Sequence, residues 1–152
     1  MSNQEILNLV RETIERELAT EPSVPIRVAV FDVITCVPGV RLPFEAMIKL
    51  VREYKILSLV DGAHCVGQMP LNLREADPDF FVSNLHKWLY VPRSSAILYV
   101  PKRNQHIIHP AVVNASYKRT SKGEPSDFQA EFVWPGTMDY SSHMCVVAGK
   151  LY

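Results

Sequence analysis

The chain has 152 residues, of which 47% are hydrophobic and 21% charged, as is typical of a folded single domain rather than a disordered chain. Sixteen basic residues balance sixteen acidic ones, so no net charge would draw the chain to nucleic acid or an anionic membrane. The N-terminus lacks the pattern of a secretory signal, and no apolar run approaches the roughly 18 residues of a membrane span. We therefore expect a cytoplasmic protein whose three widely spaced cysteines stay reduced.

The first part of the chain alternates between helical and strand patterns. Apolar residues recur at helical spacing over residues 3–19, and a nearly continuous β-branched and aromatic run predicts a strand over residues 26–34 that is buried on both faces. A second helical pattern opens at Pro43, and residues 56–60 form a second apolar strand. Strand, helix and strand within about 35 residues predict the βαβ unit of a parallel sheet.

The later part of the chain is less regular. Short strands are predicted over residues 79–82 and 95–100, which completes an α/β fold with a mostly parallel sheet and flanking helices. Residues 101–140 hold most of the late prolines and glycines and show little periodicity, so we interpret them as an irregular excursion over the surface. Residues 141–152 begin another helix, for which Ser141 or Ser142 is the predicted N-cap.

Charged side chains follow two of the predicted strands. Asp61 ends an apolar strand, and in a parallel sheet ligands bind at the carboxyl ends of the strands. Taken alone, Asp61 is more often a turn residue before Gly62, and a lone lysine is usually solvated. Lys87, however, follows the next strand and is flanked by His86 and Trp88, an environment that favours a nucleophilic amine. An aspartate and a lysine at neighbouring strand ends indicate pyridoxal phosphate, bound to the lysine as a Schiff base with its ring nitrogen held protonated.

Other interpretations of the polar residues are weaker. Four residues offer metal-ligand chemistry, namely Asp61, His64, Cys65 and His86. Their spacing is not that of a zinc site, so no metal is expected, and either histidine alone is as often a core residue. Lys118, Arg119 and Lys122 could contact phosphate, although a solvated loop is the simpler interpretation. The chain contains neither G-x-G-x-x-G nor G-x-S-x-G, which removes the main support for nicotinamide-binding and α/β-hydrolase functions.

Three motifs together resemble a known enzyme family. They are D-G-A-H beginning at Asp61, S-N-L-H-K-W beginning at Ser83 and G-T-M-D beginning at Gly136. In order and spacing they are similar to those of class V aminotransferases, which are fold-type-I enzymes dependent on pyridoxal 5'-phosphate, and within them to the isopenicillin N epimerase-like branch near the cysteine desulfurases. The resemblance implies that residues 1–152 form one incomplete domain, the second half of the large domain, without a complete small C-terminal domain.

The resemblance also implies roles for individual residues. Lys87 would be the catalytic lysine that binds the cofactor, and Asp61 would pair with the pyridinium nitrogen. His64 would lie against the ring or near its phenolic oxygen. The cofactor phosphate would be contacted by His86, by Ser83 or Asn84, and by Thr137 from the neighbouring subunit of a homodimer. In relatives a glycine follows the turn after the lysine, whereas Ser94 stands there in this chain.

The family implies a small amino-acid substrate and a reaction that is a transamination, epimerisation, desulfuration or elimination. The alternative is a truncated, catalytically inactive remnant that only associates with a full-length relative, because relatives carry a phosphate-binding loop before this segment and a substrate-binding arginine after it. A small α/β binding module without cofactor would require the motif match to be accidental. Nucleic acid and membranes are not expected as partners.

Overall fold

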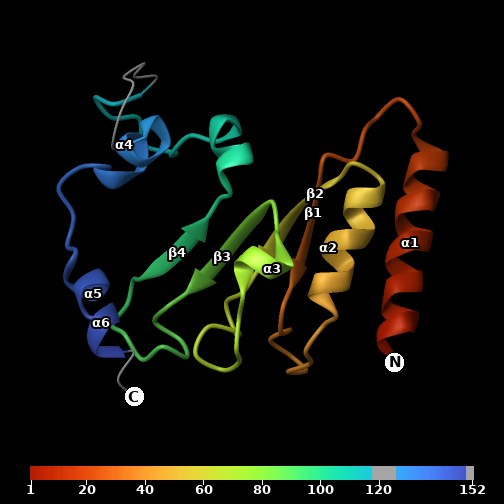
Figure 1. The fold of residues 1–152 in the computed structure, drawn as a ribbon, viewed down its shortest axis with the longest axis horizontal. Coiled ribbons are helices and arrows are strands. Elements are labelled where there is room, and N and C mark those ends of the chain that lie inside the picture. The colour runs from red at the N-terminus through yellow and green to blue at the C-terminus, as the bar shows by residue number, and fades with distance from the viewer. Residues whose placement is uncertain (118–125, 150–152) are drawn as a thin grey trace.

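The computed structural model describes residues 1–117 and 126–149, which form an α/β fold around one four-stranded sheet (Figure 1). The elements are α1 (Asn3–Thr20), β1 (Val28–Asp32), α2 (Phe44–Glu53), β2 (Leu57–Asp61), α3 (Leu73–Ala76), β3 (Phe80–Asn84), β4 (Ala96–Tyr99), the 3₁₀-helix η1 (Lys102–Ile107), α4 (Asp127–Val133), α5 (Ser141–Met144) and α6 (Val146–Gly149). The predicted fold class is confirmed. No helix within the described residues is long and apolar enough to cross a membrane.

The strands lie in the order β1-β2-β3-β4, and only β4 runs antiparallel to its neighbour. In the sheet Asp61 is the register partner of Asp32 on β1 and of Val82 on β3. Because β1, β2 and β3 are parallel, their carboxyl ends meet at one edge of the sheet. This edge is where the sequence predicted the site.

The main core lies between α2 and one face of the sheet. The helix buries its apolar residues, which are Phe44, Met47, Ile48, Leu50 and Val51. Phe44 and Ile48 pack in one cluster with Val60 of β2 and Phe81 of β3. Burying each such side chain stabilises the fold by roughly 1.5–3 kcal/mol. The interhelix contact is smaller, with Ile14 of α1 packed against Val51.

The other face of the sheet is not covered by the described residues. Phe31 and Ala29 face the helices, while the alternating Val28 and Val30 are 42% and 67% exposed. The prediction that this strand is buried on both faces is therefore wrong. Its cause is that α1 and α2 pack on the same side, so only one layer of helices meets β1.

Two predictions for the second half of the chain are corrected by the structure. The range 101–140, interpreted as irregular, contains the helical elements η1 and α4. The single helix predicted from residue 141 is two short helices, and neither serine is its N-cap, which is Tyr140. The Ser142 hydroxyl instead donates to the Arg93 carbonyl 2.7 Å away. This contact joins α5 to the segment between β3 and β4, beside which α5 and α6 lie in Figure 1.

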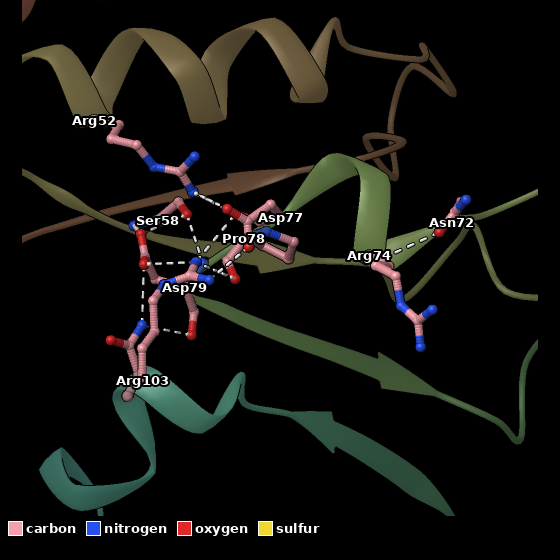
Figure 2. Close-up of polar contacts among 9 residues, drawn as sticks. Arg52, Ser58, Asn72, Arg74, Asp77, Pro78, Asp79 and Arg103 are labelled. Atoms are coloured by element: carbon pink, nitrogen blue, oxygen red, sulfur yellow. Dashed lines mark hydrogen bonds and ion pairs between the residues drawn. The ribbon is translucent and has the colours of Figure 1, made fainter.

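A polar network ties η1 to the amino-terminal ends of β2 and β3, the edge opposite the predicted site (Figure 2). The buried Asp79 carboxylate accepts hydrogen bonds from the Ser58 backbone N–H at 3.0 Å and from Arg103 at 3.2 Å. Arg103 also pairs with Asp77 at 2.6 Å, and Asp77 pairs with Arg52 of α2 at 3.1 Å. The network therefore fixes η1 and α2 against the same two strands.

Candidate active site

The predicted site residues at the carboxyl edge of the sheet lie on two neighbouring strands and the turns that follow them. Asp61 is the last residue of β2, and Asn84 is the last residue of β3. A cavity of about 360 Å³ opens beside them, lined by Asp61, Val82, Ser83, Asn84, Ala96, Ile97 and Leu98. This volume is within the usual range of small-molecule sites.

Asp61 has a role in its own turn. One carboxylate oxygen accepts a hydrogen bond from the Ala63 backbone N–H at 2.8 Å, as the turn-capping interpretation predicted. The second oxygen makes no hydrogen bond with the described residues, and the side chain lines the cavity. The residue after Asp61 is glycine because a Cβ at position 62 would lie 2.2 Å from the Phe81 ring. The D-G pair thus fits a turn packed on β3 and still leaves Asp61 able to bind a cation.

The turn after β2 brings His64 to the predicted lysine. His64 Nε2 lies 3.3 Å from Lys87 Nζ, and the Trp88 indole N–H donates to His64 Nδ1 at 3.2 Å. Lys87 is exposed, so its amine is open to a ligand. Sequence reasoning placed His64 near the cofactor but missed the contact with Trp88, because that contact depends on how two loops 24 positions apart dock in space.

The turn after β2 lies close to the backbone of residues 85–95, the loop between β3 and β4 that carries Lys87 and is called the lysine loop here. Gly67 has a φ of +90°, and a Cβ there would lie 2.2 Å from the Trp88 carbonyl oxygen. A Cβ on Gly149 of α6 would likewise lie 2.4 Å from the Leu89 carbonyl oxygen. Both glycines let another segment approach the lysine loop closely. Ser94, where relatives carry glycine, is not among the described non-glycine residues with positive φ, which are Lys55, Asp77 and Tyr90.

The residues predicted to contact phosphate lie in different surroundings. The Ser83 hydroxyl donates to the Gly62 carbonyl at 2.8 Å and is buried, whereas Asn84 is half-buried at the cavity. His86 places Nδ1 3.0 Å from the Ser95 carbonyl oxygen, and Nε2 has no hydrogen bond with the described residues. The Ser95 hydroxyl is buried without a hydrogen-bond partner in the described part of the chain. Asn84 therefore keeps donor capacity for an anion, and His86 Nε2 can donate when Nδ1 accepts from the Ser95 backbone N–H 3.3 Å away or when the ring carries both protons.

The remaining predicted residues lie outside this cluster. Thr137 is exposed on the segment between α4 and α5. Lys118, Arg119 and Lys122 lie outside the described residues. Among residues 1–117 and 126–149, no three His, Cys, Asp or Glu side chains gather as metal ligands would. Burial raises the pKa of the Cys65 thiol to about 11, so Cys65 stays protonated at neutral pH and is a poor metal ligand.

This donor set fits pyridoxal 5'-phosphate. A carboxylate oxygen of Asp61 is free for a protonated ring nitrogen, and the Lys87 amine is exposed for an aldehyde. Asn84 can donate to phosphate oxygens, and so can His86 when its Nδ1 accepts from the Ser95 backbone N–H. The buried Ser95 hydroxyl has no partner in the described part of the chain. The groups come from the ends of β2 and β3 and from the turns after them, so the sheet itself sets their spacing.

Comparison with known proteins gives a consistent result. The family model described as aminotransferase class-V matches residues 11–131. An L-cysteine desulfhydrase-like protein of Epichloe uncinata is 39% identical over 80% of this chain, and the L-cysteine desulfhydrase of Arabidopsis thaliana is 37% identical over 95% of it. The chain spans 30% of each of these relatives.

A solved structure shows the same fold. The cysteine desulfurase CsdA of Escherichia coli superposes with a TM-score of 0.66 at 20% identity, covering 88% of this chain and 34% of its own. The likeness supports the predicted fold-type-I architecture. The relatives named here carry desulfhydrase or desulfurase names, and the finer prediction of an isopenicillin N epimerase-like branch stays a prediction.

Proposed function

Since the chain belongs to the class V aminotransferase family, whose members depend on pyridoxal 5'-phosphate, we propose that it is the lysine-bearing part of an enzyme that cleaves a carbon–sulfur bond in an amino acid such as L-cysteine. The desulfhydrase names of relatives with 37–39% identity support this choice among the family's reactions. Residues 1–152 would correspond to the second half of the large domain.

The observation that supports the proposal is that Asp61 ends β2 and the turn after it brings His64 Nε2 to 3.3 Å from Lys87 Nζ. Asp61 would hold the proton of the cofactor's ring nitrogen through a charge-assisted hydrogen bond. Lys87 would bind the cofactor covalently. When bound, the cofactor supplies an electron sink for bond cleavage at the α- or β-carbon of an amino acid.

Three further residues would orient the cofactor. His64 would lie near the ring, and Asn84 and His86 would donate to the phosphate. Asn84 is preferred to Ser83 because the Ser83 hydroxyl is already bonded to the Gly62 carbonyl. Thr137 would reach the phosphate of a second copy in a homodimer, as the family resemblance implied. Its exposure leaves it accessible for that contact.

The proposal is tested by titrating the protein with pyridoxal 5'-phosphate and following the absorbance of the lysine-bound cofactor. We expect a saturable absorbance change that is lost in Lys87→Ala and retained in Lys49→Ala, a control at an exposed lysine of α2. An absorbance change that survives Lys87→Ala would contradict the proposal. Sulfide release from L-cysteine then tests the reaction.

The hypothesis of an inactive remnant stays a second candidate, because the chain covers 30% of its relatives' length. The same experiments separate the two. Cofactor uptake at Lys87 without sulfide release would favour the remnant. Uptake followed by sulfide release from the chain alone would exclude it.

A further inference from the structure

His64 is contacted on both of its ring nitrogens. The Trp88 indole N–H donates to Nδ1 at 3.2 Å, and Lys87 Nζ lies 3.3 Å from Nε2. Trp88 directly follows the lysine in the chain, so one short loop supplies both partners of the imidazole. This pair of contacts determines where the proton of His64 lies.

The indole nitrogen can only donate, so Nδ1 must be the acceptor in the contact with Trp88. A neutral imidazole carries one proton, which must then be on Nε2. The Nε2–H therefore points at Lys87, whose nitrogen offers a lone pair to accept it only when the amine is uncharged. That lone pair is the one a nucleophilic amine uses.

We propose that Trp88 is a positioning residue, which fixes the tautomer and orientation of His64 so that Nε2–H is directed at the Lys87 nitrogen. The inference rests on the proposed function, because it assigns Trp88 to the lysine site of that enzyme. Trp88 does not touch the reacting group in this arrangement and acts through the imidazole. The general precedent is the fixing of a histidine tautomer by the partner of its other ring nitrogen.

Two further observations support this role. Trp88 is 40% exposed, so burial of its ring accounts for only part of what this side chain contributes to the stability of the fold. The backbone of Trp88 is itself the surface on which the His64 turn docks, because a Cβ on Gly67 would lie 2.2 Å from its carbonyl oxygen. Trp88 thus meets the turn through both its peptide group and its indole, which leaves the imidazole little freedom to turn away.

The hydrogen bond can be tested without cofactor, because the chain has two tryptophans and gives two indole N–H signals in a ¹H–¹⁵N correlation spectrum. We expect His64→Phe, which keeps an aromatic ring but removes the acceptor, to shift the Trp88 signal and speed its exchange with water. The Trp134 signal is the internal control, since Trp134 stacks on Tyr140. His64→Gln, whose amide oxygen can accept, should retain the slow exchange.

A Trp88 signal that exchanges equally fast in the wild-type chain and in His64→Phe would overturn the proposal. The consequence for the site is measured by the rate at which Lys87 takes up pyridoxal 5'-phosphate. Trp88→Phe should change this uptake rate by about 2- to 12-fold, the range that corresponds to one neutral hydrogen bond, whereas Trp134→Phe should leave it unchanged. Equal rates in wild type and Trp88→Phe would also overturn it.

The two proposals fail in different ways. If the wild-type chain takes up no cofactor, the proposed function fails, while the indole signals still decide whether Trp88 holds His64. If uptake occurs at Lys87 but the indole signal ignores His64→Phe, the proposed function stands and the positioning role is wrong.

Discussion

Two glycines in the turn after β2 are required for different physical reasons. Gly62 is needed because a Cβ would overlap the buried Phe81 ring, although its φ is not in the left-handed region. Gly67 needs both a φ of +90° and the absence of a Cβ beside the Trp88 carbonyl. The position of His64 relative to Lys87 therefore depends on Gly67, which lies between the two in the chain.

Gly67→Ala should be strongly destabilising. The left-handed conformation costs an L-residue about 1–2 kcal/mol, and the clash with the Trp88 carbonyl adds to this. We expect the free energy of unfolding, measured with urea, to fall by about 2 kcal/mol or more. Gly39→Ala is the control, because nothing lies within 4 Å of its Cβ position. Equal unfolding midpoints for the two variants would contradict the assignment.

The Asp61→Asn variant should distinguish the role of Asp61 in its turn from its role in binding the cofactor. The Asn side-chain oxygen can still accept from the Ala63 N–H, so the fold should be unaffected. Loss of a charge-assisted hydrogen bond should weaken pyridoxal 5'-phosphate binding by about 10- to 150-fold. Equilibrium titration measures this, with Asp32→Asn, the register partner on β1, as the control. A larger loss of pyridoxal 5'-phosphate affinity in Asp32→Asn than in Asp61→Asn would mean that Asp61 is not the carboxylate that pairs with the ring nitrogen.

At this scale the sequence could predict the chemical groups but not their partners. Asp61 and Lys87 stand out in the sequence because each follows an apolar strand, a local pattern. The Trp88–His64 contact depends on how two loops dock, and no local pattern encodes that. The left-handed backbone of Gly67 and its close approach to Trp88 are likewise properties of the folded chain.

The elements at the opposite edge of the sheet are joined by Asp79 (Figure 2). Burial raises the pKa of this carboxyl, but hydrogen bonds from the Ser58 backbone, Asn104, Arg103 and the Ser58 hydroxyl outweigh burial and bring the pKa below its ordinary value. The unfolded chain then binds the proton more readily than the folded one. Asp79 therefore stabilises the fold above its unfolded pKa of 3.8, and this contribution is lost as the pH falls through the lower, folded value.

Asp79→Asn should lower the free energy of unfolding at neutral pH by about 1–3 kcal/mol, because a buried acceptor of several hydrogen bonds loses its charge. The loss should shrink below about pH 4, where the wild-type carboxyl also begins to protonate. Urea unfolding from pH 3 to 7 measures both effects. Asp77→Asn, at an exposed pair, should cost no more than about 1 kcal/mol. A difference between Asp79→Asn and wild type that does not change with pH would contradict the linkage.

Among the elements, the long periodic ones were predictable and the short ones were not. The capping box of Ser126 and Gln129 that begins α4 is present in the sequence but lies in a stretch with little apolar periodicity. Ser142 was expected to cap a helix, yet its hydroxyl bonds to Arg93, a residue 49 positions away. Long-range partners of this kind override local capping preferences.

On the scale of the whole molecule, the sheet has one covered and one uncovered face within the described residues. The uncovered face carries exposed apolar side chains on its two edge strands, including Val28, Val30 and Leu98. Apolar edge strands favour association between chains. The sequence predicted continuous apolar strands correctly, but it could not show that the described chain supplies helices to only one face.

Val30→Lys should reduce self-association of the 152-residue chain, because it places a charge on the exposed face of edge strand β1. Sedimentation velocity over a range of protein concentrations would measure this. The control is Lys49→Ala, which also changes one exposed charge, but on α2, the helix that packs on the covered face of the sheet. If Val30→Lys associates as strongly as the wild-type chain, the uncovered face is not the contact surface.

We propose Lys87 as the residue to which pyridoxal 5'-phosphate binds. Borohydride reduction of the protein mixed with the cofactor converts a lysine adduct into a stable secondary amine, and peptide mass spectrometry locates it. We predict the added mass on the peptide that contains Lys87, and its loss in Lys87→Ala. Added mass confined to other lysines, or none at all, would show that Lys87 does not bind the cofactor.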